Sequence, residues 1–458
     1  MVMAPSAILL NPEDTIIENY DKNNLLATNH GDGKLAYAKK GLAAKELVKR
    51  VLLEQVACID TDTCDPDEEN AFYVADLGEV YRQHIRWKTN LPRVKPFYAV
   101  KCNPDPEVIR LLATLGSGFD CASKAEIDLV LGLGVDPTRI IYAQPCKTKS
   151  YLRHAANVGV SQMTFDNSDE LHKIKNSYPN AEIVLRILTD DSASLCRLST
   201  KFGADLETAN DLLCLARELS LNVVGVSFHI GSGAADPSAF AKAVTDAKWV
   251  FDQAAFHGFD LKLLDVGGGF TDETFEVFAN ELNNALEEHF PPHVRVIAEP
   301  GRYYTANAFT LATNIIARRD VSSLPSTPRS ITSNGSEISA GSTTEKSYML
   351  YLNDGVYGNF SNIIFDHQHP TAQVLHANRS ADTNKLIEYS IWGPTCDGID
   401  VISEHCYLPG TLDIGDWLFF ENMGAYTKCS ATRFNGFKDM HETIYITTEP
   451  GASALLGY

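Results

Sequence analysis

A lysine closes one of the most apolar segments of the chain. Lys101 follows the run 96–100, Pro-Phe-Tyr-Ala-Val, which has the composition of a buried strand. A lysine that is desolvated at a strand end can lose its proton, and the neutral amine can bond covalently to a carbonyl carbon. The alternative is an ordinary strand-end lysine whose ammonium group reaches water. Lys101 by itself does not distinguish these two interpretations.

Two glycine-containing segments could bind a phosphate group. Three consecutive glycines, 267–269, follow the apolar run 263–266, and glycines let backbone N–H groups approach an anion closely. The second segment, 298–302, adds the backbone of Gly301 and the cation of Arg302. The pattern is neither GxGxxG nor a P-loop, so it indicates neither a dinucleotide nor a triphosphate. A tight turn would explain the three glycines equally well.

Glu299 and His229 could contact the rest of such a ligand. A carboxylate at Glu299 could keep a ring nitrogen protonated, so that the ring withdraws electrons. It could instead pair with Arg302. His229 ends an apolar run and precedes Gly-Ser-Gly at 231–233, so its flat ring could stack on another flat ring. A lone histidine in this setting is also often a satisfied core residue.

A thiol and two carboxylates stand out near turns in the last third of the chain. Cys396 lies between two glycine turns, where an exposed thiol could donate a proton. Asp366 and Asp397 could bind the ammonium group at the far end of a substrate. Each of these residues, taken singly, is also a common turn residue.

Eight short apolar runs have the length and composition of buried strands. They are 97–101, 118–122, 139–143, 163–167, 182–187, 223–230, 261–266 and 294–299. The intervals between them have helical spacing, and the apolar run 303–316 could be the eighth helix. The alternation predicts a closed (β/α)8 barrel, and a doubly wound open sheet alternates in the same way. Polar or glycine residues recur at the ends of the runs, where a barrel would place its active site.

The pattern changes after the last of these runs. Residues 322–344 are rich in Ser, Thr, Pro and Gly, which is typical of a flexible insert. The pattern then predicts strands of a separate C-terminal β-domain, a β-sandwich or β-barrel, over the runs 348–352, 372–375, 387–392, 416–421 and 442–447. We predict a barrel over 77–316, and a polar, partly disordered extension over 1–40.

Composition excludes several classes of function. The chain has 458 residues, enough for two domains, and a formal net charge of -20, which opposes binding to nucleic acid or anionic membranes. No apolar run is long enough to span a bilayer, and the first residues lack the features of a secretory signal. The ten cysteines are scattered, without metal-binding spacing. These features predict a metal-free protein of the reducing cytoplasm.

The chain resembles the eukaryotic ornithine decarboxylases, which belong to the fold III group of pyridoxal phosphate enzymes. The resemblance is carried by PFYAVKCNP (96–104), FDCASKAEI (119–127), YAQPCK (142–147), CRLSTKFG (196–203), VSFHIGSG (226–233), LLDVGGGF (263–270), AEPGRYY (298–304), NDGVYGNF (353–360), WGPTCDGID (392–400) and MGAYTKCSATRFNGF (423–437). These motifs span about residues 40 to 440 in order. The phenylalanine at 365 stands where some relatives have tyrosine.

The resemblance implies a cofactor, pyridoxal 5'-phosphate, and a role for each site residue. Lys101 would bind the cofactor covalently, His229 would stack on its ring, and Glu299 would pair with the ring nitrogen. The other cofactor-binding positions would be Asp120, Arg186, Ser232, Gly267, Gly268, Gly269, Pro300, Gly301, Arg302 and Tyr426. Asp366 and Asp397 would bind the side-chain ammonium group of the substrate, with Phe365 beside them. Cys396 would return a proton to carbon after carbon dioxide leaves.

The resemblance also implies L-ornithine as the substrate and putrescine as the product, the entry step of polyamine biosynthesis. The active site would form between the two subunits of a head-to-tail homodimer, with Cys396 and Asp397 supplied by the second subunit. The β-domain would include 41–76 together with 317–458. Lysine, arginine or diaminopimelate decarboxylases of the same fold remain alternatives, as does a non-catalytic regulator. An antizyme-like partner could bind 139–160, a segment with basic residues at Lys147, Lys149 and Arg153.

Overall fold

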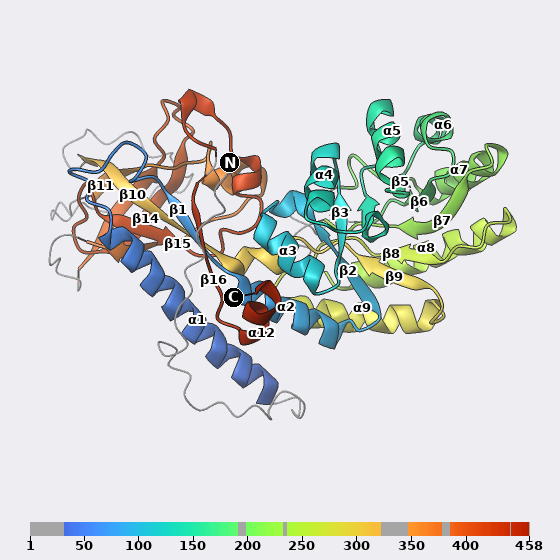
Figure 1. The fold of residues 1–458 in the computed structure, drawn as a ribbon, viewed down its shortest axis with the longest axis horizontal. Helices are drawn as coiled ribbons and strands as arrows, with labels where there is room; N and C mark the ends of the chain where they lie inside the picture. The colour runs from blue at the N-terminus through green and yellow to red at the C-terminus, as the bar shows by residue number, and fades with distance from the viewer. Residues whose placement is uncertain are drawn as a thin grey trace, which may run out of the picture. The chain divides into compact units, whose positions relative to one another are not determined.

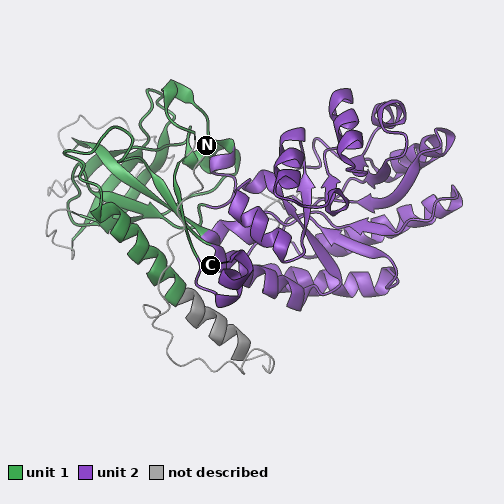
Figure 2. Cartoon of the chain, in the orientation of Figure 1, with its two compact units in different colours: residues 1–76, 309–423, 430–446 green, residues 77–308, 424–429, 447–458 purple. Residues whose placement is uncertain are grey.

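The computed structural model describes residues 32–190, 198–231, 236–321, 347–377, 385–439 and 441–457, with side chains from Ala43 onward. Ser232, most of the N-terminal extension and the whole Ser/Thr-rich insert lie outside the described residues. The chain divides into two compact units (Figure 2). We call residues 77–308, 424–429 and 447–458 the barrel unit, and residues up to 76, 309–423 and 430–446 the sheet unit. Among the described helices, none has the length and apolar character needed to cross a membrane.

The barrel unit contains a closed ring of eight parallel strands in the described part of the chain (Figure 1). They are β2 (Val94–Ala99), β3 (Gly118–Cys121), β4 (Ile140–Tyr142), β5 (Gln162–Phe165), β6 (Glu182–Arg186), β7 (Asn222–Ser227), β8 (Leu263–Asp265) and β9 (Arg295–Ala298). Each strand pairs with the next, and β9 pairs with β2 from Val94↔Val296 onward. This closure confirms the predicted barrel and excludes the doubly wound sheet.

The interior of the barrel is filled by side chains from alternate strands. Phe97, Ile141, Val184 and Leu263 belong to β2, β4, β6 and β8, and they form one buried cluster with Ile297. A layer of four bulky side chains from every second strand is the usual filling of an eight-stranded barrel. The predicted strands are therefore apolar because both of their faces are covered.

Helices alternate with these strands, and the first of them precedes the first strand. The described helices of the ring are α2 (Leu77–Asn90), α3 (Pro106–Thr114), α4 (Lys124–Gly132), α5 (Lys149–Val158), α6 (Ser168–Ser177), α7 (Leu206–Glu218), α8 (Ser238–Phe256) and α9 (Phe275–His289). Side-chain caps fix several starts: Asp105, for example, accepts hydrogen bonds from the first N–H groups of α3.

The predicted helix over 303–316 is wrong. Only one helical turn, α10 (Arg302–Thr305), follows β9, and β10 (Phe309–Asp320) then begins the return to the sheet unit. The first seven residues of β10 are all buried, so the run lacks the alternation that would have marked it as a strand. Its β-branched residues favour the extended conformation. The helix that completes the ring is α2.

The sheet unit contains a mixed eight-stranded sheet within the described residues. Its strands are β1 (Phe72–Asp76), β10, β11 (Ser347–Leu352), β12 (Ala372–His376), β13 (Leu386–Trp392), β14 (Val401–Pro409), β15 (Trp417–Phe420) and β16 (Thr443–Ile446). Helix α1 (Asp32–Ala57) packs on it through Val51, Leu52 and Val56, beside Trp417. The predicted β-domain strands correspond to β11, β12, β13, β15 and β16, whereas β1 and β14 were missed.

Candidate active site

Lys101 lies just beyond the end of β2 and contacts a buried carboxylate. The single 3-10 turn Val100–Cys102 follows the strand, and Lys101 Nζ donates a hydrogen bond to Asp120 Oδ2 at the end of β3. Burial opposes the positive charge of Lys101, but Asp120 and Glu299 outweigh it and raise the lysine pKa above its usual value. The structure therefore holds Lys101 as a cation, rather than as the neutral amine that desolvation alone would produce.

Three carboxyl groups surround this position. Asp120 and Asp265 are fully buried, and Glu299 is 6% exposed. Burial raises the pKa of Asp265 to about 6, and burial together with Asp120 and Asp265 raises the pKa of Glu299 well above its usual value. Asp120 Oδ1 is buried without a hydrogen-bond partner among the described residues. The cluster thus carries more acid than Lys101 can neutralise, which fits a ligand with a cationic ring nitrogen.

Asp265 was missed by the sequence reasoning. It is the last residue of β8, and its Oδ1 accepts a hydrogen bond from the N–H of Gly267 at 2.9 Å. The signal was present, because an aspartate that ends an apolar strand two residues before three glycines needs a reason to be buried.

His229 is a neutral imidazole beside these acids. Its Nδ1 lies 2.8 Å from the carbonyl oxygen of Ile230, and its Nε2 lies 3.9 Å from Glu299 Oε2. Burial lowers the pKa of His229 well below its usual value, and the charges of Arg186 and Lys101 lower it further. The neutral ring donates from Nδ1 to the carbonyl and leaves Nε2 unprotonated. A flat, uncharged ring of this kind is suited to stacking on a flat cofactor.

The glycines after β8 are required by their surroundings. A Cβ atom on Gly268 would lie 2.9 Å from His229 Nε2 and 3.0 Å from the carbonyl oxygen of Glu299. Gly267 and Gly269 have φ angles of 66° and 100°, which favour glycine. Gly301 is equally confined, because its Cβ would lie 2.8 Å from Cys102 Cβ. The two predicted phosphate segments are therefore tight turns, in which glycine lets the backbone pack closely against neighbouring residues.

Arg302 and Tyr426 come together from distant parts of the barrel unit. The Arg302 guanidinium carbon lies 5.3 Å from the centre of the Tyr426 ring. Tyr426 has a φ of 55°, and its N–H donates to the carbonyl of Cys102 at 3.0 Å. Lys428 anchors the same segment through Asp105 at 2.7 Å. The contact supports the prediction that both residues serve one ligand.

Arg186 ends β6 and is influenced by the same acidic cluster. Desolvation lowers the pKa of its guanidinium, and Glu299, Asp166, Asp120 and Asp265 partly restore it. Its guanidinium carbon lies 5.2 Å from the centre of the Phe202 ring. The charge of Arg186 also helps to keep His229 neutral.

The predicted substrate-binding residues belong to the sheet unit. Asp366 is buried directly after α11 (Asn362–Phe365), whereas Phe365 is 63% exposed. Cys396 is an exposed free thiol, and its N–H donates to Asn435 Oδ1 at 3.0 Å. The hydroxyl of Tyr357 donates to the Asp397 carboxylate and lowers its pKa.

Two aromatic residues beside Asp397 were also missed. The rings of Tyr357 and Phe434 stack with their centres 4.4 Å apart. Both border a cavity of about 290 Å³ within the sheet unit. Nothing in their spacing marked them, because Phe434 is far from Tyr357 in sequence and reaches it only through the fold.

Comparison with known proteins identifies the family. The family described as "Pyridoxal-dependent decarboxylase, pyridoxal binding domain" matches residues 77–306. The chain is 60% identical to an ornithine decarboxylase of Neurospora crassa over 93% of this chain and 91% of that one. It is 49% identical to antizyme inhibitor 2 of Xenopus laevis over 87% of this chain and 84% of that protein. A solved lysine/ornithine decarboxylase from Vibrio vulnificus, complexed with putrescine, is 30% identical, with a TM-score of 0.70 over 83% of this chain and 95% of that one. The chain therefore belongs to the family of pyridoxal-dependent decarboxylases that includes the ornithine decarboxylases.

Proposed function

We propose that this protein decarboxylates L-ornithine to putrescine and carbon dioxide with pyridoxal phosphate as its cofactor. The observation that carries the proposal is the position of Lys101 among three buried acids, beside a neutral His229. The three glycines 267–269, which we call the glycine loop, lie next to His229. The relative from Neurospora crassa, at 60% identity, supports ornithine as the substrate.

The barrel unit would hold the cofactor. When bound, pyridoxal phosphate supplies a protonated ring that takes up the electron pair left behind by carbon dioxide. Glu299 would hold the proton on the ring nitrogen, His229 would cover one face of the ring, and Lys101 would form the covalent attachment. The phosphate would lie at the glycine loop, Gly301 and Arg302, where backbone N–H groups and one cation are available.

The sheet unit would serve the substrate. Asp366 and Asp397 would bind the distal ammonium group of ornithine, because buried or hydrogen-bonded carboxylates pair well with a primary amine. The Tyr357 hydroxyl keeps Asp397 ionised, which suits that role. The exposed thiol of Cys396 would deliver the proton that completes putrescine.

Turnover of three amino acids separates this function from its alternatives. Purified protein is assayed for carbon dioxide release from L-ornithine, L-lysine and L-arginine, with and without added pyridoxal phosphate. We expect ornithine to be used fastest and turnover to depend on the cofactor. Equal rates on lysine would favour a lysine/ornithine enzyme, and no turnover of any of the three would favour a non-catalytic regulator.

We further propose that the protein is a head-to-tail homodimer whose active sites are shared. Cys396 and Asp397 belong to the sheet unit, and Lys101 and Glu299 belong to the barrel unit. A second subunit could supply one set to the other, as the resemblance implies. Mixing of subunits that carry different inactivating substitutions tests this idea.

A regulatory partner would bind helix α5 and the residues before it. The expectation that Lys147 contributes to this surface is wrong, since its side chain is 0% exposed and pairs with Glu170 at 3.0 Å. Lys149 and Arg153 are exposed and remain available. The similarity to an antizyme inhibitor supports an antizyme-like partner. Lys149→Glu with Arg153→Glu should weaken its binding in a pull-down, and unchanged binding would exclude this surface.

We also propose that the protein works in the cytoplasm. All nine cysteines in the described residues are free thiols, which suits a reducing compartment. Cell fractionation tests this, and recovery in the secreted fraction would contradict it.

A further inference from the structure

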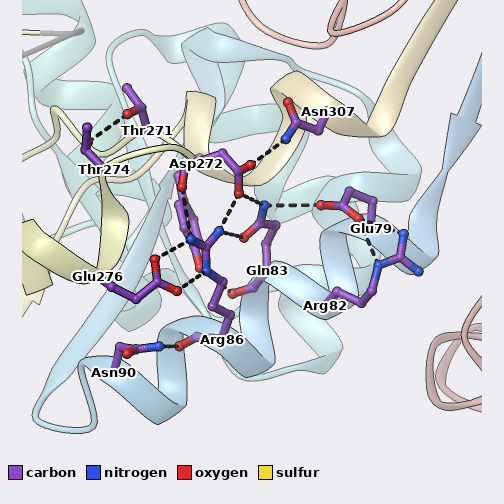
Figure 3. Close-up of polar contacts among 11 residues, drawn as sticks. Glu79, Arg82, Gln83, Arg86, Asn90, Thr271, Asp272, Thr274, Glu276 and Asn307 are labelled. Atoms are coloured by element: carbon purple, nitrogen blue, oxygen red, sulfur yellow. Dashed lines mark hydrogen bonds and ion pairs between the residues drawn. The ribbon is translucent and has the colours of Figure 1, made fainter. Parts of the chain in front are cut away.

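Helix α2 carries a row of polar side chains that the proposed chemistry does not use. Arg82 and Gln83 follow Glu79 by three and four residues, and Arg86 follows them by four and three, which places all four on one side of the helix (Figure 3). Gln83 is 1% exposed and Arg82 is 7% exposed. Burying polar groups is costly unless they are hydrogen-bonded, so their partners indicate what the row does.

Two members of this row, Gln83 and Arg86, converge on Asp272. Its Oδ1 accepts hydrogen bonds from Gln83 Nε2, at 2.8 Å, and from Arg86 Nη1. Its Oδ2 accepts one from Asn307 Nδ2 at 3.0 Å, and its main-chain carbonyl accepts one from Arg86 Nη2 at 2.9 Å. A single aspartate therefore ties α2 to two separate loops.

Both loops lead to the proposed phosphate site. Asp272 follows Gly269 by three residues, and Asn307 follows Arg302 by five. Backbone hydrogen bonds to the β9 segment hold the start of the loop, from Val266 to Ile297 and from Glu299 to Gly267. The later part of the loop, up to the start of α9 at Phe275, belongs to no strand or helix. The hydrogen bonds of Asp272 constrain this later part, at the far side of the glycine loop.

The cation that holds Asp272 is itself held firmly. Arg86 donates from Nε and Nη2 to the two carboxylate oxygens of Glu276 at 2.7 and 2.6 Å, a bidentate arrangement that fixes the guanidinium plane. The guanidinium carbon lies 5.2 Å from the centre of the Phe275 ring. Burial opposes the charge, but Glu276 and Asp272 outweigh it and keep the pKa of Arg86 above its usual value.

We propose that Asp272, held by Gln83 and Arg86, is a positioning residue for the phosphate end of the cofactor. The inference rests on the proposed function, because it takes the glycine loop and Arg302 as the phosphate site. Asp272 acts through the backbone that it restrains: it keeps the N–H groups of the loop and the turn at Arg302 in register with each other. Its loss should weaken the binding of the phosphate group and spare the binding of the ring.

Two ligands that differ only in the phosphate make this testable. Apoprotein is titrated with pyridoxal phosphate and with pyridoxal, and each Kd is measured from the absorbance of the bound ligand. We expect Asp272→Ala to raise the Kd for pyridoxal phosphate by about tenfold or more, since it removes several charged hydrogen bonds. The Kd for pyridoxal should change by less than about twofold, because pyridoxal has no phosphate for the loop to bind. The phosphorus NMR shift of bound pyridoxal phosphate should move in the variant.

Glu276→Ala is the matched control. It removes the other carboxylate partner of Arg86, and Glu276 belongs to α9 rather than to the glycine loop. We expect the Kd for pyridoxal phosphate to change by less than about threefold in this variant. Equal weakening of both ligands by Asp272→Ala, or an equal effect of Glu276→Ala, would overturn the inference, because either result indicates general destabilisation.

A second variant guards against failure to fold. If apoprotein carrying Asp272→Ala does not show a cooperative melting transition, Asn307→Ala replaces it, since Asn307 is exposed and donates to the same carboxylate. The same selective loss, of smaller size, is expected. Wild-type protein that binds no pyridoxal phosphate would refute both the proposed function and this inference. Wild-type protein that binds it, with an unchanged Kd in the variants, would refute the inference alone.

Discussion

The protonation of Lys101 and Glu299 depends on the buried carboxyl groups that surround Lys101. Burial opposes the charge of Lys101, but its acidic neighbours, Asp120 first, raise its pKa, and burial raises the pKa of Glu299. These shifts favour the protonated form of each group, whereas the proposed chemistry needs a nucleophilic lysine and an ionised glutamate. Moving one proton from Lys101 and one from Glu299 would prepare both residues for a ligand that carries an aldehyde and a ring nitrogen.

Substitution of the two residues closest to the proposed chemistry should abolish turnover. We expect Lys101→Ala to lose most ornithine decarboxylation, and Cys396→Ala to slow it by about a hundredfold or more, the usual contribution of a positioned proton donor. Two control variants should retain activity. Lys95→Ala removes an exposed lysine of strand β2, and Cys58→Ala removes another exposed thiol. Near-normal carbon dioxide release by either test variant would remove that residue from the mechanism.

The raised pKa of Asp265 predicts a pH dependence of stability. A carboxyl group whose pKa rises from 3.8 to about 6 on folding stabilises the fold most below pH 4 and loses that contribution as pH rises through 6. Asp265→Asn cannot ionise, so between pH 4.5 and pH 7 the variant should gain about 2 kcal/mol of stability relative to the wild type. Urea unfolding of both apoproteins at the two pH values measures this. A difference that stays constant with pH would show that Asp265 does not titrate as described.

At the scale of elements, the glycine loop is shaped by what lies behind it. Gly268 approaches both His229 and the backbone of Glu299, so the turn after β8 and the strand end at β9 fix one another. The loop is therefore part of the site's geometry before any phosphate binds. This explains why a tight turn and a phosphate cradle were equally compatible with the sequence: the same three glycines are needed for both.

Gly268→Ala should weaken cofactor binding without unfolding the barrel. The new methyl group would lie 2.9 Å from His229 Nε2, so the imidazole must move from its position beside Glu299. We expect the Kd for pyridoxal phosphate to rise about tenfold, a cost of roughly 1.4 kcal/mol. The control is Gly132→Ala at the end of α4, where an added Cβ meets nothing within 4 Å. Equal cofactor affinities in the two variants would show that the loop adapts.

The elements that the sequence predicted best are the strands of the barrel. The eight barrel strands are short apolar runs between helical intervals, and all of them form. The run 303–316 failed because a strand buried on both faces and a buried helix have the same apolar composition. Strand β14 was missed because Glu404 and His405 are exposed in its middle, and two adjacent polar residues interrupt the alternation that marks a strand.

The candidate site was predictable only where motif and strand end coincide. Lys101, His229 and Glu299 each follow an apolar run, so local sequence marks them. Tyr357 and Phe434 gain their place beside Asp397 from tertiary packing alone, which no local pattern records. Asp272 lacks a marker for the same reason, since its partners lie on α2, far earlier in the chain.

At the scale of the whole molecule, the proposed dimer predicts complementation. Lys101→Ala and Cys396→Ala subunits, each inactive alone, are mixed and allowed to exchange. If every site uses Lys101 of one subunit and Cys396 of the other, random pairing restores about a quarter of the wild-type sites. Activity that rises on mixing would support shared sites, and activity that stays at the level of the separate variants would refute them.

The matched mixture combines Lys101→Ala with Glu299→Gln. Both residues belong to the barrel unit, so each site of a mixed dimer would lack one of them whichever way the subunits pair. We expect no recovery in this mixture. Recovery in both mixtures would mean that exchange restores activity by some route other than the sharing of sites.

The barrel unit also has a bearing on how the protein is made. The sequence of this unit is interrupted twice. Its main part ends at residue 308, and it then includes residues 424–429, which carry Tyr426, and the segment with helix α12 (Pro450–Leu456). Arg82 on α2 donates to Thr448 at 2.7 Å and to Glu449 at 3.2 Å, directly before that helix. A chain emerging from the ribosome can therefore close its eight strands long before it receives the tyrosine beside Arg302. Nascent protein should acquire its barrel first and its ability to retain the cofactor only after residues 424–429 have emerged.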